Sequence, residues 1–428
     1  MLGTPMVLLT EELGASPFVV GLCYSFVFLL APFQILATAL LHILGYKRQT
    51  IFFWSLRGLC IIPILWIAFS QPERGDPVAI WTLVIALFFF TIFRSIGAAA
   101  PIPWLYDLIP ERVRGRYFAT DLAIVGFCGV FTLILCAAAF LYLDTFTAIQ
   151  SQFLFAIAGS FIAVFAISRL PSVPHPEPNS IGHILKAAPR LFTENRAFRN
   201  YTTLSVIVTA VNAAAYPFFA FYLKRNAGFD QVPILYFAAI QSFGGYLGAL
   251  VVRSWIDRVS VRYAFIVSLV LHIINYTYWI SVLVGFEGLL FLCPFMFFLI
   301  GGAGSFYHAA HNKHMPQLTD RGSRPLSVAL ITTSIGFGTG IFASGLGFVL
   351  KDKDGAFSDG RFLIYLGFAL LVQVVLIIAY KKMEDQNRDA EPLVAITGWL
   401  RPFRGLFSFG LPLQRSGAEE KDHNHAKD

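Results

Sequence analysis

Residues 118–143 read FATDLAIVGFCGVFTLILCAAAFLYL, and Asp121 is the only charged residue in this run. An α-helix needs about 20 apolar residues to cross the hydrocarbon core of a bilayer. A run of this length and composition predicts a membrane-spanning helix. A surface helix of a soluble protein would carry a polar face.

Comparable apolar runs recur along the rest of the chain. They are separated by short polar stretches and are Pro17–Leu44, Ile51–Phe69, Ile80–Leu108, Phe153–Leu170, Phe198–Leu223, Val232–Val252, Ala264–Val284, Leu289–Ala310, Val328–Leu350 and Phe362–Tyr380. Met1–Leu13 is apolar but too short to span, so we expect it to be the last half of a first helix that begins upstream of Met1 and is truncated here. The sequence predicts an all-α integral membrane protein.

Composition excludes the soluble classes. The chain has 428 residues, of which 57% are hydrophobic and 13% charged, whereas soluble domains carry about 25% charged residues. The net charge of +7 does not indicate a nucleic-acid partner, because the basic residues do not form a stripe on a polar segment. The five cysteines lie in apolar runs without the spacing of a disulfide or a metal site.

Lysines and arginines in the short loops predict the orientation. Loops facing the cytoplasm carry an excess of these residues. The loops alternate between the two sides of the membrane, and the loops of one side contain more lysine and arginine than those of the other. Their basic residues are Lys47, Arg48, Arg112, Arg114, Arg116, Arg253, Arg258, Arg262, Lys313, Arg321 and Arg324. We expect this set to be cytoplasmic, together with the C-terminus, in the inner membrane of a bacterial-type cell.

Four regions follow from the polar gaps. We expect a transmembrane bundle over residues 1–170, a cytoplasmic linker over 171–197, a second bundle over 198–380 and a partly disordered tail over 381–428. Within the linker, Ile181–Phe192 has the pattern of an amphipathic helix that lies along the membrane surface.

The two bundles resemble each other at an offset of about 207–215 residues. Gly14-Ala15-Ser16 corresponds to Gly228-Phe229-Asp230, Gly45-Tyr46-Lys47 to Ser260-Val261-Arg262, and Arg114-Gly115 to Arg321-Gly322. Each pair falls in the same loop of its half. Duplicated bundles that hold a solute between their halves are a common plan of secondary transporters.

Three loops resemble motifs of the major facilitator superfamily. Arg253–Arg262 contains Asp257-Arg258-Val259-Ser260-Val261-Arg262, similar to the family motif D-R-x-G/S-x-R/K between the second and third helix of a half. Pro110–Arg116 is similar to the loop P-E-x-x-R-G-R after helix 4, and Pro316–Gly322 is a looser version after helix 10. The resemblance implies two six-helix bundles. In the first half, His42-Ile43 replaces the D-R pair of the family.

The resemblance also implies a cytoplasmic gate. In the family, a helix-4 acid often pairs with the basic loop after helix 2. Here that implies contacts of Asp107 with Lys47 and Arg48, near Arg114, and a corresponding cluster of Asp257, Arg258 and Arg262 in the second half. The alternative is that these residues are solvated charges that only set topology.

Two arginines lie well inside apolar runs, several residues from either end. Arg94 precedes Asp107 by thirteen residues, which is about 20 Å of helix. A charge at that depth normally faces a cavity or a partner, so we expect Arg94 to contact an anionic solute or to form a buried structural pair. Arg57 lies about 9 Å into its run, and we expect its side chain to reach the headgroups.

Polar residues of the second half are further candidates for solute binding. Asn212 and Tyr216 are four residues apart and share a helix face, and Gln241 lies in the middle of its run. These groups could equally form hydrogen bonds between helices. His308, His311 and His314 do not line up on one helix face, and we expect no metal site.

Together, these features predict a gradient-driven permease for a small solute. No nucleotide-binding loop or catalytic constellation is present in the sequence, so we expect neither an enzyme nor a cofactor. We expect a monomer in the lipid bilayer, with a small-molecule solute as its partner. The alternative is a degenerate, non-transporting member of the same family that acts as a sensor or an assembly partner.

Overall fold

The computed structural model describes residues 9–10, 13–15, 17–174, 181–225, 227–229, 231–318, 323–350 and 358–383. These ranges contain α-helices and short 3-10 segments but no strand. The helices of the first half are α2 (Pro17–Leu29), α3 (Phe33–Ala37), α4 (Leu41–Leu59), α5 (Ile61–Ser70), α6 (Pro77–Ala98), α7 (Pro101–Leu108), α8 (Arg114–Tyr142) and α9 (Thr145–Ser168).

The linker helix α10 (Ile181–Glu194) leads into the second half. Its helices are α11 (Arg196–Arg225), α12 (Gln231–Arg253), α13 (Val261–Leu283), α14 (Cys293–His314), α15 (Arg324–Leu350) and α16 (Asp359–Lys381). Short 3-10 segments adjoin the helices of both halves: Thr38–Leu40, Glu111–Val113, Glu287–Leu292 and Met315–Gln317.

Within the described ranges, nine helical segments are long and apolar enough to cross a membrane. The segment Phe33–Ser70 counts as one of them, although its chain turns at Gly45, which has φ 69° and ψ 163°. Glycine tolerates this positive φ because it has no Cβ. The turn divides the predicted runs Pro17–Leu44 and Ile51–Phe69, and Pro32 separates α2 from α3. The predicted multi-pass membrane fold is confirmed.

Local sequence signals start several helices. The Asp76 carboxylate accepts a hydrogen bond from the Val78 N–H at 2.9 Å, with Pro77 at the first helical position. Asp144 caps α9 in the same way through the Thr147 N–H at 3.0 Å. A side-chain oxygen at this position satisfies a backbone donor that the helix leaves unpaired.

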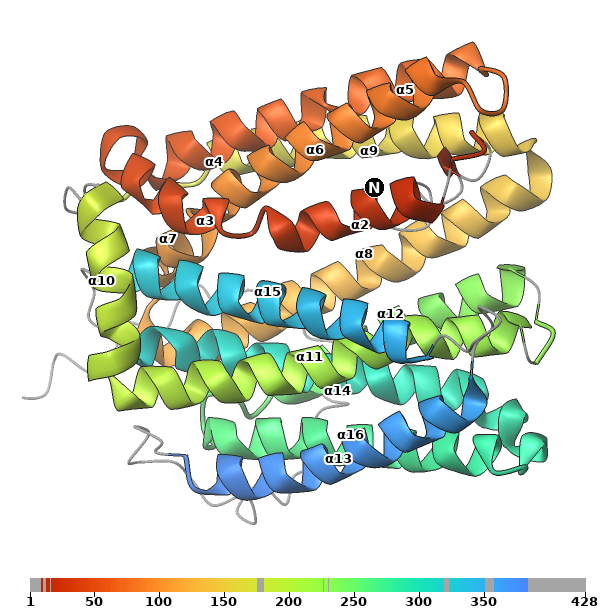
Figure 1. The fold of residues 1–428 in the computed structure, drawn as a ribbon. Helices are drawn as coiled ribbons and strands as arrows, with labels where there is room; N and C mark the ends of the chain where they lie inside the picture. The colour runs from red at the N-terminus through yellow and green to blue at the C-terminus, as the bar shows by residue number, and fades with distance from the viewer. Residues whose placement is uncertain are drawn as a thin grey trace, which may run out of the picture.

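The helices form two bundles that lie side by side (Figure 1). Across their boundary, α8 packs against α12 and α15 packs against α2. Helix α10 lies across one end of the molecule, where it contacts α3 of the first bundle and α11 and α15 of the second. We call this the α10 end, and the opposite end the far end.

The apolar core is arranged differently at the two ends. At the α10 end, one cluster joins Tyr106 and Phe118 of the first half to residues of the second half such as Phe265 and Tyr307. Toward the far end, each half has a separate cluster, one around Leu87 and the other within the second half. Among the described residues, the two halves therefore share a core at the α10 end and have separate cores at the far end.

One element of the predicted repeat is visible in the backbone. Gly14 has φ 65° and Gly228 has φ 69°. These glycines precede α2 of the first half and α12 of the second. The same left-handed residue at the same position supports the first aligned pair of the repeat. The second pair differs, because Gly45 has positive φ whereas Ser260 caps α13 with φ −56°.

The predicted linker helix is present as α10. Its residues Leu191 and Phe192 pack against the core that the two halves share, so this part of its apolar face contacts protein. Most of the predicted tail and of the segment Met1–Leu13 lies outside the described residues. The prediction of a truncated first helix therefore remains a prediction.

Candidate functional site

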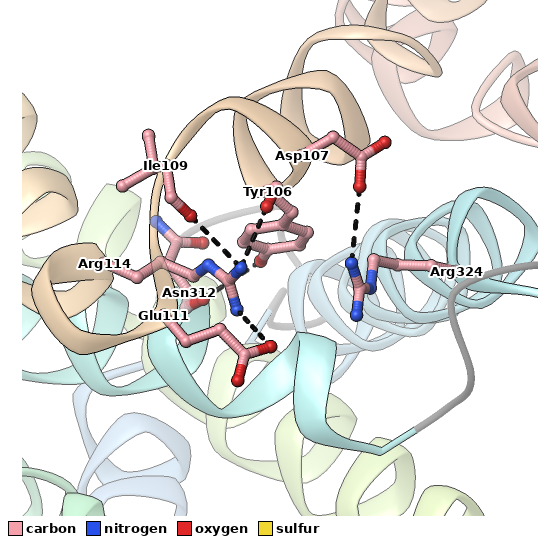
Figure 2. A network of polar contacts seen from close by, with 7 residues as sticks. All are labelled: Tyr106, Asp107, Ile109, Glu111, Arg114, Asn312 and Arg324. Carbon is pink, nitrogen blue, oxygen red and sulfur yellow. Dashed lines mark hydrogen bonds and ion pairs between the residues drawn. The ribbon is translucent and has the colours of Figure 1, made fainter. Parts of the chain in front are cut away.

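The basic loops that the sequence assigns to one side gather at the α10 end. The starts of α4 and α8, the α12–α13 loop and the start of α15 all lie there. Polar groups of both halves meet at this end, and we call them the α10-end cluster: the side chains of Tyr106, Asp107, Arg114, Asp257 and Arg324, and the backbone carbonyl of Asn312. Four of these six, Tyr106, Asp107, Asn312 and Arg324, take part in side-chain bonds between the halves that Figure 2 shows.

Asp257 joins the α12–α13 loop to the first turn of α8 in the other half. Its Oδ1 accepts a hydrogen bond from the Gly115 N–H at 3.0 Å, and its Oδ2 accepts one from the Arg116 N–H at 2.8 Å. A carboxylate at a helix N-terminus satisfies free donors and interacts favourably with the helix dipole. Burial raises the pKa of Asp257, and the two backbone donors and Lys313 offset part of this effect.

Gly115 is required for this contact. A Cβ at position 115 would overlap Asp257 Oδ1 and would lie 3.1 Å from both Ile256 and Lys313. Any larger residue would push the loop away from α8. Lys313 itself donates to the Ile256 carbonyl at 2.6 Å and supports the loop from α14.

Arg114 is buried and holds the end of α7. Its Nη2 donates to the carbonyl of Tyr106 at 2.8 Å and to that of Ile109 at 3.3 Å, while Nη1 lies 3.5 Å from Glu111 Oε1 (Figure 2). Terminal carbonyls of a helix lack hydrogen-bond donors within the helix, so Arg114 provides donors for these two carbonyls. Tyr106 in turn donates its hydroxyl to the Asn312 carbonyl of α14 at 3.0 Å.

Arg324 at the start of α15 pairs with Asp107 of α7. The Nη1–Oδ1 distance is 3.5 Å, and the arginine side chain is 8% exposed against 37% for the aspartate. The sequence predicted basic partners for Asp107 from its own half, Lys47 and Arg48. In the structure, the ion pair of Asp107 crosses to the second half, and Lys47 Nζ donates to the Leu170 carbonyl at 2.8 Å.

The remaining predicted gate residues lie near this cluster. Arg48 and Arg258 are exposed, and neither side chain bonds to a described residue. Arg262 donates to Ser260 Oγ at 3.0 Å and to the Lys381 carbonyl at 3.4 Å, so its contacts stay within the second half. Only Asp257 of the predicted trio reaches the first half.

Arg94 lies on the inward side of α6. The apolar residues Val78, Ile85 and Phe89 mark the exposed outer face of this helix, whereas Phe90 and Thr91, one turn before Arg94, are buried. Arg94 is nevertheless exposed. Arg94 is thus an exposed charge on an otherwise buried helix face.

Asn212 and Tyr216 face interior partners of the second half. Asn212 Oδ1 accepts from the Tyr276 hydroxyl at 2.7 Å and from Gln373 Nε2 at 2.9 Å. The Tyr216 hydroxyl lies 2.8 Å from His272 Nε2. These contacts are the helix-bridging alternative that the sequence left open. They do not test solute binding.

Gln241 is half-buried on α12 and forms no side-chain hydrogen bond with a described residue. Its carbonyl lies against Gly301 of α14, where no Cβ would fit. On α14, His311 Nδ1 lies 2.6 Å from the Tyr201 hydroxyl. His308 is exposed on the same helix.

Solved structures with a similar fold are transporters. A bacterial homologue of the iron transporter ferroportin, in its outward-facing state, has a TM-score of 0.66 at 14% identity and covers 88% of this chain and 93% of its own. A variant of the Escherichia coli fucose:proton symporter FucP has a TM-score of 0.65 at 15% identity, with 90% and 95% covered. The proton:xylose symporter XylE, bound to 6-bromo-6-deoxy-D-glucose, has a TM-score of 0.65 at 12% identity, with 89% and 91% covered.

No relative among curated protein sequences matches this chain. A sequence model of the Major Facilitator Superfamily matches residues 1–273, which is more than half of the chain. This match agrees with the multi-pass helical fold and includes the two loop motifs at Pro110–Arg116 and Arg253–Arg262. The chain belongs to the Major Facilitator Superfamily of membrane transporters.

Proposed function

We propose that this protein moves a small solute across the inner membrane of a bacterial cell by alternating access, driven by a gradient. The observation that carries the proposal is the difference between its two ends. The halves share one core and a set of polar bonds at the α10 end, whereas the described residues form separate cores toward the far end. Such an asymmetry is expected of a transporter that opens its two sides in turn.

The α10-end cluster serves as the gate on the cytoplasmic side. The excess of lysine and arginine in its loops supports this orientation. Three contacts cross between the halves. They are the Asp257 cap of α8, the Asp107–Arg324 pair and the Tyr106–Asn312 bond. Each can break when the halves rock apart, because water would then solvate the released groups.

The solute site lies between the halves, with Arg94 of α6 as a contact. Its exposure on an inward helix face supports this assignment. Gln241 of α12 remains a candidate, since its side chain has no partner among the described residues. Asn212 and Tyr216 stabilise the interior of the second half through their contacts with Tyr276, Gln373 and His272.

The gate can be tested without knowing the solute. Arg48 and Arg258 lie in different halves at the α10 end, and both are exposed. Spin labels on cysteines at these two positions, in a chain whose five native cysteines are replaced, report the separation of the halves. Alternating access requires at least two distance populations in lipid nanodiscs.

Transport itself is tested by flux into proteoliposomes. Pools of sugars, organic acids, phosphates and amines are screened by thermal shift, and the hits are measured as labelled solutes with and without an imposed proton gradient. A single immobile distance population, together with no flux of any solute, would contradict the proposal.

A further inference from the structure

Two arginines face the interior of the first half at the same depth. Arg57 follows the Gly45 turn by twelve residues, or about 18 Å of helix, and Arg94 precedes Leu108, the end of α7, by fourteen residues, or about 20 Å. Because α4 and α6 pack against each other and run in opposite directions, both distances are measured from the α10 end.

Arg57 does not point toward lipid. The outer face of its helix carries Phe52 and Leu59, which are 54% and 47% exposed. Arg57 lies on the opposite face, one turn from the buried Phe53. Its guanidinium carbon lies 4.8 Å from the ring centre of Trp54 and 5.7 Å from that of Phe90 on α6. The helix also begins earlier than the sequence suggested, which places Arg57 deeper than the expected 9 Å.

No acid accompanies the two charges. Helices α4 and α6 contain neither aspartate nor glutamate. Within the described part of the chain, neither arginine forms an ion pair or a hydrogen bond, and Arg57 Nε is buried without an acceptor. A single charge at this depth is costly, and such residues usually pair with one another or mark a substrate pathway. Here two like charges lie on packed helices at the same depth, and the Arg57 guanidinium lies near Phe90, one turn before Arg94.

We propose that Arg57 and Arg94 form a binding site for the oxyanion group of the transported solute, a carboxylate or a phosphate. The proposal rests on the transport function above and assigns its substrate class. A guanidinium presents several N–H donors in a planar fork that matches two oxygens of such a group. An oxyanion between the arginines would neutralise their repulsion and supply the acceptors that both lack.

The two residues have different tasks. Arg94 is exposed on the inward face of α6 and contacts the oxyanion directly. Arg57 is held by the Trp54 and Phe90 rings, donates to the oxyanion from α4 and adds a second fixed charge. Stacking on aromatic rings stabilises the guanidinium without consuming its charge.

The test compares binding to three variants of the whole chain in nanodiscs of zwitterionic lipid. The variants are Arg57→Ala, Arg94→Ala and the control Arg169→Ala. Arg169 is a matched control because its guanidinium also lies over an aromatic ring, that of Phe165 at 4.8 Å, but at the end of α9. The probes are inorganic phosphate, glucose 6-phosphate and succinate, with glucose and choline as neutral and cationic references. Their dissociation constants are measured by titration calorimetry.

We expect at least one of the three anions to bind, and each of the first two variants to weaken it about tenfold or more, because each loses a charged hydrogen-bond donor. Arg169→Ala keeps the affinity. The variants Arg57→Lys and Arg94→Lys keep the positive charge but lack the planar guanidinium. We expect each to bind the anion more tightly than the alanine variant and more weakly than the parent protein. Repeating the titration in nanodiscs with anionic lipid shows whether lipid headgroups compete for the site.

Three results would overturn the assignment. They are anion binding that both alanine variants retain, binding of glucose or choline alone, and binding of none of the five probes by a folded chain. In the second case, flux of the neutral or cationic solute would leave the transport function standing. In the third case, immobile halves in the spin-label experiment would remove the transport function as well, whereas two distance populations would remove only the oxyanion site. Folding of each variant is checked by its unfolding temperature.

Discussion

Asp257 of the second half caps the first turn of α8 in the first half, through bonds of 3.0 Å and 2.8 Å to the N–H groups of Gly115 and Arg116. Helix caps usually join neighbours in sequence, but these bonds span more than 140 positions. The closure of the α10 end thus includes a helix N-terminus whose capping group belongs to the other half.

Asp257→Ala should open the α10 end. The change removes both acceptors, so the N–H groups of Gly115 and Arg116 remain unpaired unless the halves separate and admit water. A loss of about 1–3 kcal/mol corresponds to a shift of roughly five- to 150-fold toward the open population. The spin-label pair at positions 48 and 258 measures this shift.

Asp144→Ala is the matched control for that experiment. Asp144 caps α9 through Thr147 within its own half, so its loss should lower stability without changing the distance distribution. Equal distributions in Asp257→Ala and the parent protein would show that the cap does not hold the gate.

Gly115→Ala should have the same effect by a steric route. A methyl group at this position would overlap Asp257 Oδ1, so the loop must move away and the cap must break. Gly159→Ala on α9 serves as the control, because nothing lies within 4 Å of its added Cβ. The distance distribution should change in the first variant alone; a parental distribution in Gly115→Ala would contradict the close contact.

The gate should respond to pH through Asp257. Burial in the closed arrangement raises its pKa, whereas in the open arrangement the carboxyl returns to water and to an ordinary pKa. The closed arrangement therefore binds a proton more tightly. Its additional stability is present below the ordinary pKa and is lost as the pH rises through the raised value.

The spin-label distances measured across the acidic range, from neutral pH to about pH 4, provide the check. The closed population should grow on acidification in the parent protein, and this response should diminish in Asp257→Ala. The opposite sign, with opening on acidification, would show that the hydrogen bonds to the charged form outweigh its burial.

The Asp107–Arg324 pair should contribute little to closure by comparison. Asp107 is 37% exposed, and ion pairs that water can reach contribute about 0.2–1 kcal/mol. A double-mutant cycle with Asp107→Ala and Arg324→Ala, read from the same distance distribution, should give a coupling energy in that range. A coupling above about 2 kcal/mol would mean that this pair, rather than the cap, dominates the gate.

The sequence predicted the membrane fold and some residues of the α10-end cluster. Spans, the basic end and Asp257 follow from hydropathy, loop charge and a motif, because these signals are local. Arg324 was not singled out as a gate residue, since its partner lies 217 positions away. The repeat offered a signal: α8 begins at Arg114 and α15 at Arg324, and both arginines are buried. The offset between the halves in the sequence pairs Arg114 with Arg321 instead.

Other contacts could not be predicted from the types of the residues that form them. Tyr106 bonds to the backbone carbonyl of Asn312, and every residue carries such a carbonyl. The sequence predicts that the Arg57 side chain reaches the headgroups, because the apolar run that contains it begins at Ile51. The turn at Gly45 starts that helix earlier and moves Arg57 inward, where it meets Phe90.

Asn212 separates a structural role from solute binding. Its Oδ1 accepts hydrogen bonds from Tyr276 and Gln373, both fully buried, so Asn212→Leu leaves two donors unpaired in the interior. We expect a loss of about 1–3 kcal/mol in unfolding free energy, seen as a lower unfolding temperature in nanodiscs. Solute affinity per folded protein should stay unchanged, because the carbonyl oxygen is already occupied. Gln241→Leu is the contrasting change. The Gln241 side chain has no partner among the described residues, so its loss should leave the unfolding temperature unchanged and lower the solute affinity. Loss of affinity at full stability in Asn212→Leu would instead place Asn212 in the solute site, with its interior bonds broken when solute binds.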